Sequence, residues 1–294
     1  MPIDILSCYT TPPQPRDYVL PSLLPGTIGS IVSPGGQGKS ILALMLAHLV
    51  GGGVDLLGFG AVRTGRVVYL SAEDSEDIMH ERLFHLGGKL NRMQREACAE
   101  GIQAEDLTKY TPDLLNGERA GEWRNVIEQL ATDARLLILD TLRSFHSGDE
   151  NNSTSMSVLI GHLRAIAART NCAIIFLHHT SKSLSVSGQG DLQQASRGSS
   201  VLTDNIRWQA YLAGMTSEEA TKYSALTAQP IGGENKNYYV RFGISKQNYG
   251  SPFTEKWLRR GNGGILEPIQ LTSTVKNTSR ENSIKEAPNG QKHN

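Results

Sequence analysis

The chain has 294 residues, and its 29 Lys and Arg residues are balanced by 29 Asp and Glu residues. This length can bury a sizeable core in one large domain or two small ones. The balance excludes binding driven by a strong net charge, so a nucleic-acid partner would have to contact a local basic patch.

The residues at Cys8, Cys98 and Cys172 are too few for a disulfide framework, and they lack the spacing of metal ligands. The opening segment MPIDILSCYTTPPQPRDY does not have the charged and then apolar regions of a signal peptide. The longest apolar run, ILALMLAHLVGGGV, is too short to span a bilayer. These features predict a cytoplasmic protein without a membrane partner.

Along the chain, residues 1–25 carry five prolines between Pro12 and Pro25, which predicts an extended N-terminal arm rather than a helix. Residues 26–270 then alternate between continuous apolar runs and amphipathic runs. The apolar runs are residues 27–33, 66–74, 135–141 and 172–180, and the amphipathic runs are residues 39–50, 75–88, 122–134 and 155–170. This alternation predicts an α/β domain with a mainly parallel sheet covered by helices on both faces.

After residue 200 the pattern changes to short alternating runs at residues 205–214, 237–248 and 255–264. They predict antiparallel strands added to one edge of the sheet. Residues 271–294 are polar and nearly free of large apolar side chains, which predicts a disordered tail.

The segment SPGGQGKS, residues 33–40, follows a predicted strand and opens a predicted helix, as a Walker A loop does. In such a loop the backbone N–H groups of Gly35, Gly36, Gln37 and Gly38 would point at phosphate oxygens. The helix N-terminus adds a favourable dipole. The segment therefore predicts a nucleotide-phosphate site.

Two side chains complete this loop. Lys39 would reach the β- and γ-phosphates of ATP, and the Ser40 hydroxyl would ligate Mg²⁺. Ser33 departs from the pattern, because the first residue of the motif is usually glycine. The alternative is a glycine-rich turn with a capping serine, which the position between strand and helix disfavours.

Carboxylates end two of the predicted strands. Asp140 follows LLIL, where it could hold the Mg²⁺ shell of a bound nucleotide, although a strand-end helix cap is the alternative. Glu73 ends YLSAE, where it could polarise an attacking water as a general base. The alternative is a helix cap, a role that Asp74 or Ser75 could also fill.

A histidine pair, His178 and His179, ends the run FLHH. Adjacent strand residues face opposite sides of a sheet, so the pair is a poor metal site. One of the two would point towards the site, where it could sense the γ-phosphate. A purely structural role is the alternative.

The motifs SPGGQGKS, YLSAED, LLILDTLRSFH, FLHHTSK, QQASRGSSVLTDNIRWQ and FGISKQNYG together resemble the RepA replicative helicases of mobilisable broad-host-range plasmids. The resemblance covers about residues 17–268. That family is part of the RecA/DnaB-like group of ring ATPases. The resemblance implies a RecA-like P-loop ATPase core, ATP and Mg²⁺, and a homohexameric ring. It also implies 5′-to-3′ movement on single-stranded DNA, with a plasmid initiator and a primase as further partners.

Carried onto the matching positions, the resemblance makes Lys39 and Ser40 the phosphate and Mg²⁺ contacts and Asp140 the Walker B carboxylate. It makes Glu73 the general base. His179 takes the place where DnaB-like proteins carry a γ-phosphate-sensing glutamine.

The resemblance also assigns Arg207, in DNIRWQ, as an arginine finger that acts on the ATP of the neighbouring subunit. DnaB-type proteins carry Lys-x-Arg near the last strand, whereas this chain reads Lys246-Gln247-Asn248 and lacks that arginine. The departure strengthens the case for Arg207, with Lys246 as a second nucleotide-binding cation. The alternative for Arg207 is an ordinary surface position on a strand.

In this class of rings, DNA contacts loops that follow the Walker B and sensor strands. The matching loops are residues 143–156 and 181–197, in which Arg143, Lys182 and Arg197 could contact DNA phosphates. The alternative is a pair of solvated surface loops. The N-terminal arm is predicted to pack on an adjacent subunit.

Two other functions compete with a helicase. A RecA-like recombinase would form filaments and pair strands. A non-enzymatic, ATP-gated DNA-binding regulator would not need a general base, so Glu73 counts against it.

Overall fold

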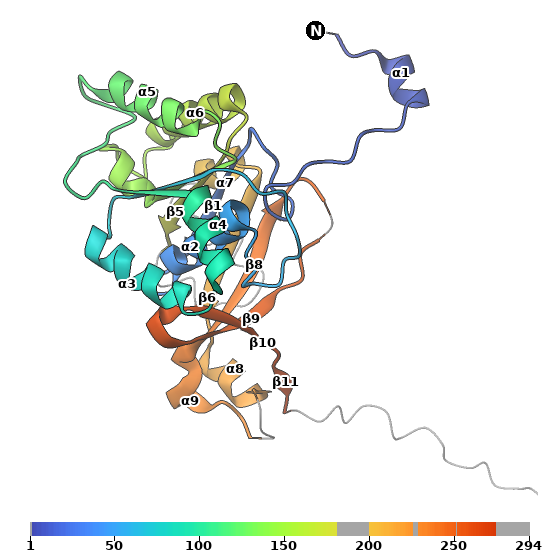
Figure 1. Cartoon of the computed structure of the whole chain (residues 1–294), viewed down its shortest axis with the longest axis vertical. Coiled ribbons are helices and arrows are strands. Elements are labelled where there is room, and N and C mark those ends of the chain that lie inside the picture. Colours follow the sequence, from blue (N-terminus) through green and yellow to red (C-terminus); the bar gives the residue numbers. More distant parts are fainter. Residues whose placement is uncertain (1, 181–199, 226–228, 251, 275–294) are drawn as a thin grey trace, which may run out of the picture.

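The computed structural model describes residues 2–180, 200–225, 229–250 and 252–274 (Figure 1). Within these residues a nine-stranded sheet has the order β10-β9-β8-β6-β1-β5-β4-β2-β3. The strands are β1 (Ile28–Ser33), β2 (Val67–Ser71), β3 (Ile102–Asp106), β4 (Leu136–Asp140), β5 (Ala173–His179), β6 (Trp208–Gly214), β8 (Tyr239–Gln247), β9 (Lys256–Arg260) and β10 (Leu266–Ile269). Strands β1 to β6 run parallel, and β8, β9 and β10 add antiparallel pairs at one edge.

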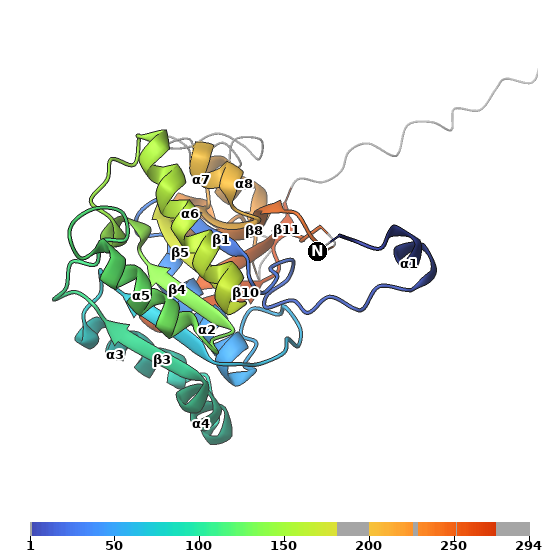
Figure 2. The same ribbon diagram turned by 90° about the horizontal axis from the view of Figure 1, so that it is seen from above.

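Helices cover both faces of this sheet. They are α2 (Lys39–Gly52), α3 (Glu76–Gly87), α4 (Arg92–Gly101), α5 (Ala120–Ala131), α6 (Ser153–Thr170), α7 (Ser200–Asn205), α8 (Ser217–Lys222) and α9 (Gly232–Asn235). Helices α2 and α3 pack on one face, and α5 and α6 lie together on the other (Figure 2). Three short 3-10 helices lie at Leu142–Phe145, Lys236–Tyr238 and Asn262–Gly264.

The strands alternate between the two cores. Ile138 of β4 packs with α2, whereas its neighbours Leu137 and Leu139 pack with α5 and α6. All three side chains are fully buried, which explains why this strand is continuously apolar in sequence. The predicted α/β class, with a mainly parallel sheet and antiparallel C-terminal strands, is confirmed.

Two details of the sheet differ from prediction. Residues 205–214 were expected to form an antiparallel addition, but β6 pairs with β1 in parallel, so that expectation is wrong for this strand. It is correct for β8 and β9. Helix α4 and the edge strand β3 were not predicted, because residues 92–106 are largely polar and half-exposed.

The chain ends also differ in part from prediction. The arm was expected to be extended, but helix α1 (Ile5–Thr10) forms before its first closely spaced prolines, with Asp4 as N-cap. The arm rejoins the body by Val19, Leu20 and Leu23, which are buried. A two-stranded sheet joins β11 (Thr272–Ser273) to β7 (Tyr223–Ser224), so the first residues of the predicted tail are ordered. The rest of that tail lies outside the described residues.

None of the helices in the described part of the chain has the length and apolar character needed to cross a membrane.

Candidate functional site

Four parallel strands bring the predicted site residues to one edge of the sheet. Ser33 at the end of β1 pairs in register with His179 at the end of β5. Asp140 at the end of β4 pairs with Ser71 of β2, two residues before Glu73. Ligand sites of open α/β sheets lie at this carboxyl edge.

The loop from Ser33 to Gly38 has the backbone geometry of a phosphate cradle. Gly36 and Gly38 have φ angles of 74° and 94°, which L side chains rarely adopt. No heavy atom lies within 4 Å of the place that a Cβ on Gly36 would occupy. Ser33 is a regular strand residue without a positive φ, so serine is tolerated where the motif usually has glycine.

Lys39 lies across this loop with only 5% of its surface exposed. Its Nζ donates hydrogen bonds to the Ser33 carbonyl (3.2 Å) and Oγ (3.3 Å), and to His179 Nδ1 (3.0 Å). Burial lowers the pKa of Lys39 to about 8, although Asp140 and Glu73 act in the opposite direction. A buried ammonium without a bound anion fits a site that accepts phosphate.

Asp140 is fully buried beside the start of α2. Its Oδ2 accepts a hydrogen bond from the Tyr69 hydroxyl (2.5 Å), while Oδ1 is buried without a hydrogen-bond partner among the described residues. Burial raises the pKa of Asp140, and the hydroxyls of Tyr69 and Ser40 oppose that rise. An unpaired carboxylate oxygen beside Ser40 fits a nucleotide-bound Mg²⁺.

Glu73 lies beside His179 and Thr141. The Thr141 hydroxyl donates to Glu73 Oε1 (2.6 Å), and the His179 Nε2 atom lies 3.6 Å from Glu73 Oε2. Because Lys39 donates to Nδ1 of the same ring, the proton of a neutral His179 lies on Nε2 and faces Glu73. His179 therefore connects the lysine and the carboxylate.

The two histidines face opposite sides of the sheet, as their adjacent positions on a strand require. His178 is buried, with its Nδ1 atom 4.0 Å from Glu150 Oε1, and Glu150 lies 3.7 Å from His146 Nε2. Burial lowers the pKa of His178. Of the pair, His179 is the one that contacts the candidate site.

Arg207 and Lys246 lie at the opposite edge of the sheet. The Arg207 N–H donates to the carbonyl of Ile28, at the start of β1, and Lys246 pairs in register with Gln209 of β6. Burial is the largest cause that lowers the pKa of Lys246, and the nearby Arg207 lowers it further. The structure therefore brings these two cations to each other but not to the loop of their own chain.

Among the predicted DNA contacts, Arg143 is exposed and donates to the Gly148 carbonyl (2.8 Å). The other two, Lys182 and Arg197, lie outside the described residues.

One cation at the loop was not predicted from sequence. Arg260, the last residue of β9, donates from Nη2 to Gln37 Oε1 (3.2 Å). Its Nη1 lies 3.7 Å from where a Cβ on Gly38 would be. Burial lowers the pKa of Arg260, and its Nε has no hydrogen-bond partner among the described residues. In sequence, only the position of Arg260 at the end of a strand could have indicated this.

Comparisons with known proteins agree with this geometry. A family described as an AAA domain matches residues 4–184. A solved helicase ATPase domain is 14% identical, with a TM-score of 0.58, and the match covers 83% of this chain and 85% of that one. The crystal structure of the RadB recombinase is 13% identical, with a TM-score of 0.48, over 82% of this chain and 90% of that one. The chain therefore belongs to the AAA domain family, and its fold is that of the RecA-like P-loop ATPases.

Proposed function

We propose that the chain hydrolyses ATP on residues 33–40 and uses the energy to move 5′ to 3′ along single-stranded DNA, as a homohexameric helicase of plasmid replication. The observation that carries the ATPase part is the contact of His179 with both Lys39 and Glu73 beside the phosphate cradle. The resemblance to plasmid replicative helicases and the likeness to the solved helicase ATPase domain support the helicase part.

In the proposed reaction, Lys39 and the loop N–H groups bind the phosphates, and Ser40 and Asp140 hold Mg²⁺. When bound, Mg²⁺ would neutralise charge on the phosphate oxygens. Glu73 takes a proton from the attacking water through one carboxylate oxygen, while the Thr141 hydroxyl fixes the other. His179 stabilises the orientation of that carboxylate and of Lys39.

Arg207, with Lys246 beside it, would complete the site of the next subunit. A guanidinium placed against the transferring phosphoryl group stabilises its charge and is worth several orders of magnitude in rate. In its own chain Arg207 is held next to Ile28, so only a second copy can supply it to the loop. This role requires an assembled oligomer.

The arm would hold neighbouring subunits together. Helix α1 lies away from the rest of the chain (Figure 1), and none of its residues is buried. Ile5, Leu6 and Tyr9 expose most of their surfaces there, which is unusual for such side chains in an isolated domain. We propose that they pack on the adjacent subunit.

A signal from the nucleotide to DNA would pass along β5. His179 ends this strand, and residues 181–197, with Lys182 and Arg197, follow it directly. A shift of His179 when the γ-phosphate leaves would move the start of that segment. Arg143, after β4, would add a third phosphate contact.

The test is strand displacement on a forked duplex with ATP and Mg²⁺, comparing the native chain with Lys39→Ala. The matched control is Lys222→Ala, which removes an exposed lysine of α8 whose partner is Glu218. We expect the control to unwind normally and Lys39→Ala to be inactive. Single-strand-stimulated hydrolysis without displacement would refute the helicase, and filaments by microscopy would then indicate a recombinase. DNA binding without turnover would indicate an ATP-gated regulator.

A further inference from the structure

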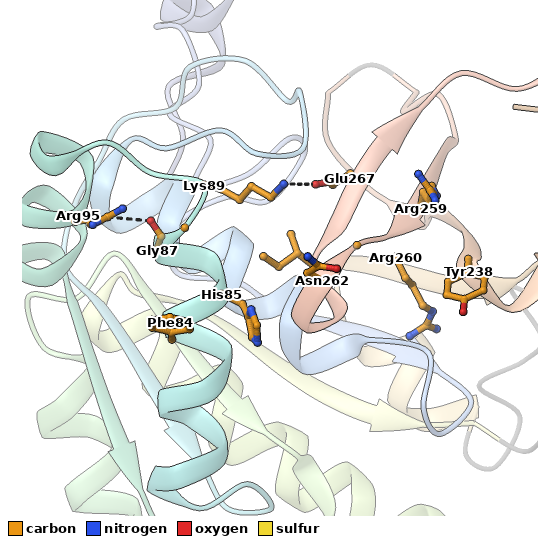
Figure 3. Close-up of a pocket in the computed structure, with 13 residues that line it drawn as sticks. Phe84, His85, Gly87, Lys89, Arg95, Tyr238, Arg259, Arg260, Asn262 and Glu267 are labelled. Atoms are coloured by element: carbon orange, nitrogen blue, oxygen red, sulfur yellow. Dashed lines mark hydrogen bonds and ion pairs between the residues drawn. The ribbon is translucent and has the colours of Figure 1, made fainter. Parts of the chain in front are cut away.

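A pocket of about 960 Å³ opens beside the phosphate loop (Figure 3). Its walls are the C-terminal end of α3, the turn to α4, and the β9–β10 hairpin. Figure 3 shows His85 of α3 pointing towards Asn262 of the hairpin, with Arg260 on the side of the phosphate loop. The volume is at the upper end of the range of about 300–1,000 Å³ that is usual for small-molecule sites.

Arg260 joins this pocket to the phosphate loop. It lines the pocket, and it also donates to Gln37 Oε1 and lies against Gly38. Leu266 of the same hairpin lies 3.5 Å from the position of a Cβ on Gly38. A ligand that follows the loop past Gly38 would therefore meet Arg260 and then enter the pocket.

The two ends of the loop have different surroundings, which gives a bound nucleotide a direction. A Cβ on Gly35 would lie 3.9 Å from His179 Nδ1, on the side of Glu73 and the buried Lys39. In the proposed reaction this is the end where the terminal phosphate is cleaved. The nucleoside end then extends the other way, past Gly38 towards Arg260.

The lining of the pocket suits a nucleoside attached to phosphate. It carries four cations, Lys89, Arg95, Arg259 and Arg260, against the single carboxylate of Glu267, which pairs with Lys89 at 2.5 Å.

Two aromatic side chains on the pocket wall are unusually exposed, Phe84 at 71% and Tyr238 at 54%. Their ring faces are free to stack on a base. The side-chain amide of Asn262, on the hairpin, offers both a donor and an acceptor to the edge of a base.

We propose that this pocket binds the base and ribose of the nucleotide whose phosphates lie on residues 33–40. This inference rests on the proposed function, because it takes ATP as the ligand of the loop. Arg260 is then a positioning residue at the junction of the phosphate and nucleoside parts. Tyr238, Phe84 and Asn262 supply the contacts to the nucleoside.

The experiment compares MgATP with magnesium tripolyphosphate, which carries three phosphates and no nucleoside. Calorimetry on the full-length protein gives the Kd of each ligand for the native chain, Tyr238→Ala, Asn262→Ala and Phe84→Ala. Met93→Ala is the matched control, because Met93 is 78% exposed on α4 and is not part of the pocket lining. All these side chains are exposed, so the variants should fold.

We expect the pocket variants to weaken ATP binding about fivefold to tenfold, as loss of a stacked or hydrogen-bonded base contact of about 1–3 kcal/mol allows. Their affinity for tripolyphosphate should not change, and the KM for ATP should rise with kcat within about twofold. ATP affinities equal to that of the native chain in all three variants would overturn the proposal. So would equal losses for ATP and tripolyphosphate. A native chain that binds neither ligand would instead refute the proposed function itself.

Discussion

ATP binding should weaken at alkaline pH because of Lys39. Burial lowers the pKa of this ammonium to about 8, so a growing fraction of the free protein carries a neutral lysine above that pH. Bound phosphates would favour the charged form and raise the pKa again. The neutral form must therefore take up a proton before or during binding, and this costs affinity.

The size of the effect follows from linkage. For one group that must be protonated, the apparent Kd is multiplied by 1 + 10^(pH − pKa). With a pKa of about 8, this factor is about 1.3 at pH 7.5 and about 11 at pH 9. ATP should then bind about eightfold more weakly at pH 9, with proton uptake rising from about 0.2 to about 0.9 per site.

Calorimetry in buffers of different protonation enthalpy measures both quantities at once. Lys39→Arg serves as the control, because a guanidinium stays charged across this range and should abolish the proton uptake. A Kd that does not change between pH 7.5 and pH 9, with no proton uptake by the native chain, would show that Lys39 is fully charged before ATP binds. It would refute the argument from burial.

Three other changes have expected outcomes. Gly29→Ala would place a Cβ 2.8 Å from the Trp208 ring and should lower the free energy of unfolding in urea by about 1–3 kcal/mol; Gly161→Ala, in open space on α6, should raise it by about 0.5–1 kcal/mol. Because burial lowers the pKa of His178, the unfolded chain binds more protons below about pH 6.5, so the urea midpoint should fall between pH 7.5 and pH 5.5, and less so in His178→Gln. His179→Asn should leave the Kd for ATP within about threefold but remove the stimulation of hydrolysis by single-stranded DNA, and unchanged stimulation would exclude the sensor role.

The sequence was most informative where one residue type has one structural reason. Buried parallel strands such as β4 read as continuous apolar runs, and the glycines at positions 36 and 38 mark backbone that only glycine adopts easily. Lys39, Asp140 and Glu73 could be expected at one edge because parallel strands place their carboxyl ends together.

Features that depend on the path of the chain were not predictable in the same way. Arg260 reaches the phosphate loop only because β9 follows two antiparallel pairings from β6 and so runs in the same direction as β1. The run EKWLRRGNGG looks like any amphipathic edge strand. Likewise, Tyr69 is a core residue by pattern, and only the register of β2 against β4 brings its hydroxyl to Asp140.

The positions of the cations also constrain how copies of the chain could assemble. Arg207 is fixed beside Ile28, five residues before Ser33 on β1, which places the two about 16 Å apart along the strand. An arginine finger at this amino edge can act only on a loop at the carboxyl edge of another copy. Such a contact joins two different surfaces, so it is heterologous, and it either closes into a ring or continues as a filament. A closed hexamer requires a rotation of about 60° at each contact, which makes the angle between neighbouring sheets the property that separates a helicase ring from a recombinase filament.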